Sequence, residues 1–180
     1  MEDTRAPWLQ EPSLEHAREQ PLATLEAEIL HPAGQPGLQA WLVPGAAMVA
    51  IGGDAAGMHP QEVMALLPPL LGLGPRHGAR LGVRTTRQGL QDFLAAGVDA
   101  HAPGEEAELL RALAADDLRH WRVTARWGDD GVRGVEVLDA TEQGIWLVVA
   151  EDDESVALMP TTTSAVWRLL TTLLPFADEL

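Results

Sequence analysis

Two stretches of the sequence share one pattern of apolar residues, and this internal repeat constrains the fold more than any other feature. Each begins with a Trp-Leu-Val segment, at residues 41–43 and 146–148, and passes through a turn into a second apolar segment. A proline and a Leu-rich amphipathic stretch follow each one, from Pro60 and from Pro160. One such unit cannot cover both faces of its own strands, so we predict two pseudo-twofold-related halves with a shared core. The alternative is that a common strand-strand-helix order recurs by chance.

Hydrophobic periodicity and turn residues predict the elements along the chain. Alternation and short apolar runs predict strands over residues 25–30, 39–43, 47–51, 81–84, 121–127, 132–139, 145–150 and 155–159. Helices are predicted at residues 13–19, from 60 to a break at 68–69, from 85 or 86 to 97, from 103, and after 160. Residues 52–57 contain three glycines and are predicted to form a loop. The predicted fold class is α+β, with antiparallel sheets and covering helices.

The domain organisation follows from where polar and apolar segments lie. Residues 1–22 are acidic and are expected to form a loosely ordered leader, in which Ser13 can cap a short helix that carries His16 on its surface. Residues 23–180 are expected to form a single α+β domain with halves at about 23–98 and 104–180. No signal-peptide stretch is present, and the longest apolar run, residues 63–73, is too short to span a bilayer. We therefore expect a soluble, cytoplasmic protein.

The composition excludes several classes of function. The chain has 180 residues, no cysteine and a formal net charge of −15, and all twelve of its basic residues are arginine. Without cysteine there is no disulfide framework, no thiolate nucleophile and no Cys-ligated metal. Such an acidic chain repels nucleic acids and anionic membranes at long range, so neither is expected as a partner.

Residues 42–174 resemble a known family. The segments Leu66-Leu67-Pro68-Pro69 and Leu71-Gly72-Leu73-Gly74-Pro75 resemble the middle of EspG-type proteins, which are associated with ESX (type VII) secretion. So does the segment from Leu81-Gly82-Val83 to the predicted helix with Leu90 and Phe93. The ending is also similar to theirs, with Gly-Ile-Trp-Leu-Val at 144–148, Val-Ala-Leu-Met-Pro at 156–160 and a closing helix over 165–174.

The resemblance implies a pseudo-twofold α+β fold and a cytosolic, chaperone-like role. Proteins of this family bind helical-hairpin substrates of the PE/PPE or WXG100-like kind and keep them soluble for export. The internal repeat agrees with that symmetry. Two departures concern the substrate: the N-terminal half is short for the family, and the turn at residues 44–46 is tight where the family uses loops for substrate contact. No binding residue is carried over from the family.

No residue pattern in the chain predicts catalysis or a cofactor. The six histidines do not pair at helical or strand spacing. His101 with Glu105 and Glu106 comes nearest to a metal cluster, but glutamates at a helix start are explained by the helix dipole. His120 is expected to lie partly buried at the start of a strand. We expect no catalytic, cofactor or metal residues.

Two groups of arginines are candidates for partner binding. Arg76, Arg80, Arg84 and Arg87 surround one loop and strand, and Arg119, Arg122 and Arg126 lie on another strand. Arg122 and Arg126 project from the face opposite the tryptophans of their strand, and we select these two as candidate partner-binding residues. The interpretation that we favour for them, however, is pairing across the sheet with acids such as Glu136 and Asp139.

The sequence therefore predicts a non-enzymatic, cytoplasmic chaperone or adaptor that binds a helical protein of a secretion system by shape and apolar complementarity. One alternative is a small-molecule-binding or hydrolytic domain with a cleft between the halves, near His101, Glu105 or His120. The other is a regulatory or immunity-type interaction domain.

Overall fold

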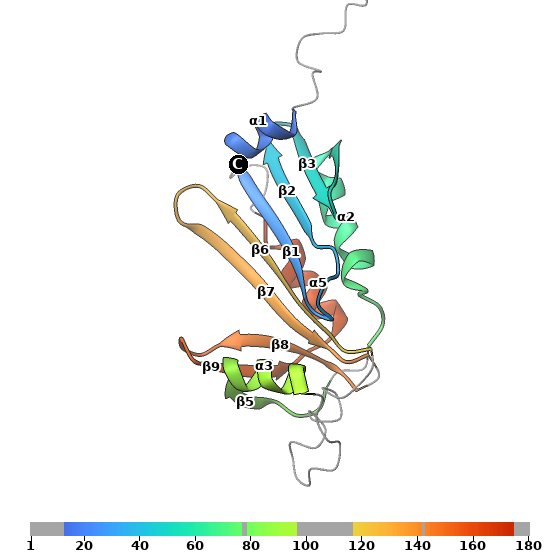
Figure 1. Cartoon of the computed structure of the whole chain (residues 1–180), viewed down its shortest axis with the longest axis vertical. Helices are drawn as coiled ribbons and strands as arrows, with labels where there is room; N and C mark the ends of the chain where they lie inside the picture. The colour runs from blue at the N-terminus through green and yellow to red at the C-terminus, as the bar shows by residue number, and fades with distance from the viewer. Residues whose placement is uncertain (1–12, 77–78, 97–116, 142, 175–180) are drawn as a thin grey trace, which may run out of the picture.

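The strands form one continuous antiparallel sheet. The computed structural model describes residues 13–76, 79–96, 117–141 and 143–174. Within them, nine strands are ordered β4-β3-β2-β1-β6-β7-β8-β9-β5, and helices lie against both faces (Figure 1). The predicted α+β class is confirmed, with a single sheet where several were expected. None of the described helices has the length and apolar character that a membrane crossing requires.

The bounds of the elements largely match the predicted ones. The strands are β1 Ala23–His31, β2 Leu38–Val43, β3 Ala46–Ile51, β4 Asp54–Met58, β5 Val83–Thr86, β6 Arg119–Trp127, β7 Gly131–Asp139, β8 Ile145–Ala150 and β9 Ser155–Pro160. The helices are α1 Leu14–Glu19, α2 Pro60–Leu71, α3 Arg87–Ala96 and α5 Thr163–Thr171. The helix predicted from Pro103, the first part of the leader, and the residues His101, Glu105 and Glu106 lie outside the described residues.

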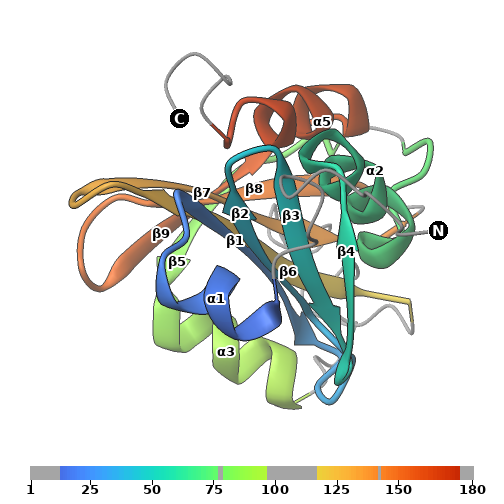
Figure 2. The same ribbon diagram turned by 90° about the horizontal axis from the view of Figure 1, so that it is seen from above.

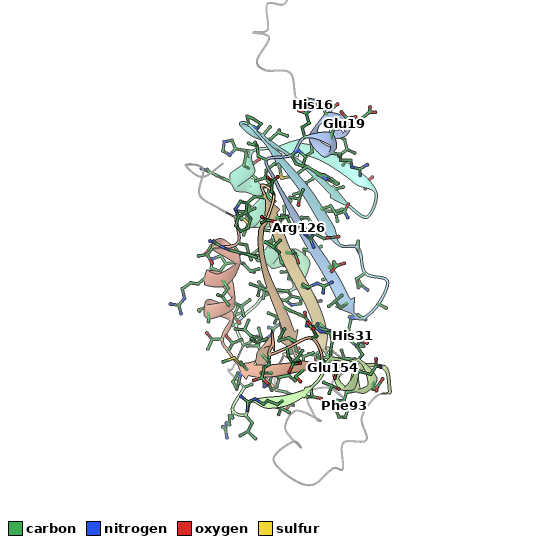
Figure 3. The ribbon with its side chains drawn as sticks, turned by 90° about the vertical axis from the view of Figure 1, so that its left-hand side faces the viewer. His16, Glu19, His31, Phe93, Arg126 and Glu154 are labelled. Atoms are coloured by element: carbon green, nitrogen blue, oxygen red, sulfur yellow. The ribbon has the colours of Figure 1, made fainter. Side chains whose placement is uncertain are left out.

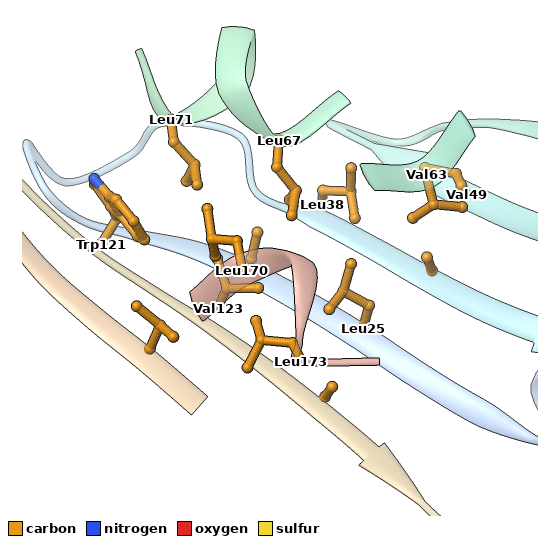
Figure 4. Packing of buried hydrophobic residues seen from close by; sticks show 14 of the residues in the cluster. Leu25, Leu38, Val49, Val63, Leu67, Leu71, Trp121, Val123, Leu170 and Leu173 are labelled. Carbon is orange, nitrogen blue, oxygen red and sulfur yellow. The ribbon is translucent and has the colours of Figure 1, made fainter. Parts of the chain in front are cut away.

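The main hydrophobic core lies between the sheet and the pair α2 and α5. Figure 2 shows these two helices on one side of the sheet, with α1 and α3 on the other. Alternate residues of the central strands enter this core because side chains of a strand point to opposite faces in turn. The largest of these buried side chains converge from both halves of the chain (Figure 4): Leu25, Leu38, Leu67, Leu71, Trp121, Val123 and Leu170.

The opposite side of the sheet has two smaller cores, one at each end. Ala17 of α1 packs with Val43 and Met48 at one end. Leu90 of α3 packs with Trp146 and Val148 at the other. Because α1 and α3 cover only the ends, the middle of this side has no helix over it within the described part of the chain (Figures 1 and 2).

The two repeated Trp-Leu-Val segments point their side chains to the same faces of the sheet but occupy different positions in it. Trp41 and Trp146 both project to the α1 and α3 side, whereas the adjacent leucines pack toward α2 and α5. Their positions in the sheet differ, however: counted outward from the β1–β6 pair, Trp41 is in the second strand and Trp146 in the third. Trp146 is fully buried, and Trp41 is half-buried. The predicted twofold relation is therefore not confirmed.

Two local predictions were wrong. Part of the expected loop at 52–57 belongs to β4, because Gly52 and Gly53, both with positive φ, make a two-residue turn that returns the chain along β3. The helix also does not end at residues 68–69, where the prolines were expected to end or kink it: α2 continues to Leu71 and ends at Gly72, in the left-handed conformation with φ +64°. Leu67 and Leu71 are both fully buried, so packing holds the last turn in place although the prolines lack N–H donors.

Candidate functional site

The candidate site is the uncovered middle of the sheet, which we call the open face. Alternate residues of β1, β6 and β7 project there because the residues between them are buried in the main core. The open face is made of Thr24, Glu26, Glu28 and Leu30 of β1, Arg122, Thr124 and Arg126 of β6, and Val132 and Gly134 of β7. His120 of β6 and Glu136 of β7 project to the same side of the sheet but are largely buried. Figure 3 shows Arg126 between α1, which carries His16 and Glu19, and α3, which carries Phe93.

The two candidate arginines pair with glutamates of the neighbouring strand β1. The register places Glu28 opposite Arg122, and Arg122 donates two hydrogen bonds to one Glu28 oxygen, from Nη2 at 2.6 Å and from Nε at 3.1 Å. Arg126 Nη1 lies 3.9 Å from Glu26 Oε2. The hydrogen bond to Glu28 and the charge of its carboxylate raise the pKa of Arg122 above its ordinary value, although burial acts in the opposite direction.

Pairing across the sheet was the favoured interpretation of these arginines, and the structure contains such pairs, although with Glu28 and Glu26 as the acids in place of Glu136 and Asp139. Both arginines nevertheless remain accessible, with side chains 41% and 59% exposed. Their role in partner binding stays a prediction.

A second ionic group lies toward α3. His120 Nε2 is 2.8 Å from Glu136 Oε1, and Arg87 Nη1 is 3.5 Å from Glu136 Oε2. Burial acts to raise the pKa of the Glu136 carboxyl, but the hydrogen bond from His120 and the charges of His120, Arg87 and Arg122 together lower it below its ordinary value. His120 lies at the start of β6, as the sequence predicted, and is buried where only partial burial was expected.

The open face continues into a shallow hollow beside α1. The hollow has a volume of about 330 Å³, and its lining includes Arg18 of α1, Glu26, Glu28 and Gln39. Gln39 Nε2 donates to Glu26 Oε1 at 3.3 Å. The Arg18 guanidinium lies 4.6 Å from the centre of the Trp41 ring, a cation–π distance. Arginines of α1 and β6 therefore border the same surface.

The other arginine group does not form one surface. Arg76 Nε donates to Oδ1 of the buried Asp139 at 3.0 Å, and Arg76 Nη2 donates to the carbonyl of Gly72, so this arginine fixes the loop that follows α2. Arg84 instead pairs with Glu151 of the β8–β9 turn. Nowhere in the described ranges do three His, Asp or Glu side chains gather as metal ligands would.

Sequence reasoning found the arginines but missed Glu26, Glu28 and Gln39. The sequence did contain a signal for these acids. In Leu25, Glu26, Ala27, Glu28, apolar residues alternate with acidic ones, just as apolar residues alternate with basic ones in β6. Only the antiparallel register of β1 and β6, which joins residues about a hundred positions apart, identifies these acids as the partners.

The chain matches no protein-family model, and no curated protein sequence matches it.

Proposed function

We propose that the protein is a non-enzymatic, cytoplasmic adaptor or chaperone that holds a helical-hairpin protein on its open face. The observation that carries the proposal is the open face itself: a sheet surface walled by α1 and α3 and exposed between them. The kind of partner, PE/PPE or WXG100-like, comes from the resemblance to EspG-type proteins. The proposal includes two related halves, since four strands followed by a helix occur twice, as β1–β4 with α2 and as β6–β9 with α5.

The shape of the open face favours a helical partner. A sheet is stable when each face packs against another layer, and helices are a common covering layer. Thr124 and Gly134 lie opposite each other near the middle, and such small residues allow a helix backbone to come close. Leu30 and Val132 add exposed apolar contacts.

The charges of the open face favour an interface as well. Arginine is enriched at protein interfaces, and Arg18, Arg122 and Arg126 border this surface in a chain of net charge −15. Arg122 is hydrogen-bonded and Arg126 is ion-paired to glutamates of β1 when no partner is bound, and the exposure of both side chains leaves donors for acidic residues of a partner.

Co-expression with helical-hairpin proteins of the PE/PPE and WXG100-like kinds, and with any that neighbouring genes encode, tests the proposal. We expect one of them to co-elute as a stoichiometric complex, and amide hydrogen exchange of β1 and β6 to slow in that complex. Arg126→Glu places a carboxylate beside Glu26 and should weaken binding at least about tenfold. Arg168→Glu, on the exposed surface of α5, is the matched control and should leave binding unchanged.

Circular dichroism melting of both variants establishes that they are folded. The proposal fails if none of these helical-hairpin proteins binds. It also fails if Arg126→Glu and Arg168→Glu affect binding equally, or if protection on binding falls outside the open face.

A further inference from the structure

Among the described residues, β4 is an edge strand that lacks the usual protection against pairing with another chain. It ends the sheet order, and Figure 2 shows it at one margin of the sheet. Asp54, Ala55, Ala56 and Gly57 are all exposed. Proteins normally guard such edges with lysine, proline, bulges or inward-pointing charges, but β4 is Asp-Ala-Ala-Gly-Met and has one charge, at its first residue.

The opposite edge of the sheet differs. β5 carries Arg84, whose side chain is 80% exposed and pairs with Glu151 at 2.9 Å. Helix α3 begins at Arg87, directly after β5, and packs beside it. The mid-strand charge of Arg84 and the packing of α3 therefore protect β5, whereas the single charge of β4 is at its first residue and α2, which follows it at Pro60, packs against β3.

The β3–β4 turn determines which backbone groups of β4 point outward. Because the turn at Gly52–Gly53 has two residues, Ile51 and Asp54, which flank it, form a hydrogen-bonded pair. Hydrogen-bonded and non-hydrogen-bonded pairs alternate along an antiparallel ladder, so Ala56 bonds toward β3. Ala55 and Gly57 are the non-hydrogen-bonded positions, and their N–H and C=O groups point away from the sheet.

We propose that β4 is a dimerisation edge, at which two copies of the chain pair antiparallel about a twofold axis at Ala56. In this register Ala55 is opposite Gly57 of the partner subunit, and the two outward-pointing residues exchange both backbone hydrogen bonds. The same exchange occurs on the other side of the axis, which gives about four bonds in total. The two sheets become one continuous sheet.

In this register, the side chains of β4 are complementary to those of the same strand in the second copy of the chain. Asp54 lies opposite Met58 of the partner subunit, so like charges do not face each other. Ala56 lies opposite its own copy, and its small side chain permits the close approach of a non-hydrogen-bonded pair. This self-complementarity favours a second copy over an unrelated extended peptide. The charge of −15 on each chain repels the two copies at long range, so salt should strengthen the dimer.

A single cysteine tests the proposed register directly, because the chain has no cysteine of its own. Non-hydrogen-bonded partners have Cα atoms about 4.5 Å apart, within the range that a disulfide spans. Ala56→Cys should therefore give a disulfide-linked dimer rapidly under mild oxidation. Ala150→Cys, an exposed strand position in β8, is the matched control and should crosslink much more slowly.

Sedimentation equilibrium of the full chain completes the test. We expect the wild-type mass to rise with concentration toward twice the monomer mass of 19.3 kDa, and to rise further at higher ionic strength. Ala55→Pro removes an outward-pointing N–H and keeps the bonds to β3, so it should remain monomeric with an unchanged circular dichroism spectrum. A wild-type chain that stays monomeric, with Ala56→Cys crosslinking no faster than Ala150→Cys, would overturn the proposal.

Discussion

The ionic side chains on the open-face side of the sheet fall into two kinds that differ in burial. Arg122 and Glu28 are each about two-fifths exposed, and exposed pairs of this kind contribute at most about 1 kcal/mol to stability. His120 and Glu136 are 7% and 11% exposed, so the loss of either partner leaves a buried polar group without its hydrogen bond. The first pair is thus available for binding at little cost in stability, whereas the second is chiefly structural.

Glu136 should make folding sensitive to acid. Its folded-state pKa is lowered, so its contribution to stability is present above its unfolded pKa of about 4.3 and is lost as the pH falls through the folded value. Glu136→Gln should lower the free energy of unfolding by about 1 to 2 kcal/mol at pH 7. Urea denaturation of wild type and variant at pH 7, 5 and 3 checks this. A difference that stays constant down to pH 3 would contradict the expected titration.

At the scale of single residues, the sequence predicted which face of the sheet a side chain points to better than it predicted which residue that side chain pairs with. Alternation around Trp121 correctly placed Arg122 and Arg126 opposite the tryptophans of β6. It suggested Glu136 and Asp139 as their acids, but Arg122 and Arg126 pair with Glu28 and Glu26, and Asp139 is bonded by Arg76. Periodicity determines the face of a side chain, and only the tertiary register determines its neighbour.

At the scale of elements, predictions succeeded where local chemistry decides the structure. Ser13 caps α1 by accepting the N–H of His16, and Thr86 accepts the N–H of Gly89 at the start of α3. Prediction failed at β4, because Ala-Ala-Gly has low strand propensity and forms a strand only by pairing with β3. Tertiary contacts override propensity there, as packing overrides the prolines of α2.

The end of α2 should depend on Gly72. This residue has φ +64°, and a Cβ there would meet the guanidinium of Arg119. Gly45, in the β2–β3 turn, has φ +74° and open space around it, so a substitution there measures the cost of the left-handed backbone alone. The atoms that a Cβ at Gly72 meets are the far end of an exposed, flexible side chain that can move aside, so Gly72→Ala and Gly45→Ala should each cost about 1 kcal/mol, the cost of the left-handed backbone.

Urea unfolding of both glycine variants measures the two costs. A clearly larger cost at Gly72 would mean that the Arg119 side chain is held in place. In that case the packing around the end of α2 is tighter than the exposure of Arg119 indicates.

At the scale of the whole molecule, the sequence predicted the α+β class and most strands but not how the halves join. The pairing of β1 with β6 places the halves side by side in one sheet. The main core then mixes Leu25 and Leu67 from the first half with Val123 and Leu170 from the second. The open face also depends on this junction, because its glutamates come from β1 and its arginines from β6.

Neither half should therefore fold alone. Fragment 1–98 lacks the core residues of the second half that pack with Leu25, and it exposes β1 as an unpaired edge. Fragment 99–180 likewise lacks the residues of the first half that pack with Val123, and it exposes β6. We expect each purified fragment to lack a cooperative thermal transition by circular dichroism, and an equimolar mixture to regain one. A 1:1 complex in the mixture, detected by light scattering, would establish that the regained structure is the paired sheet. If either fragment alone melts cooperatively near the wild-type temperature, the halves are independent domains, and the core and the open face do not require the β1–β6 junction.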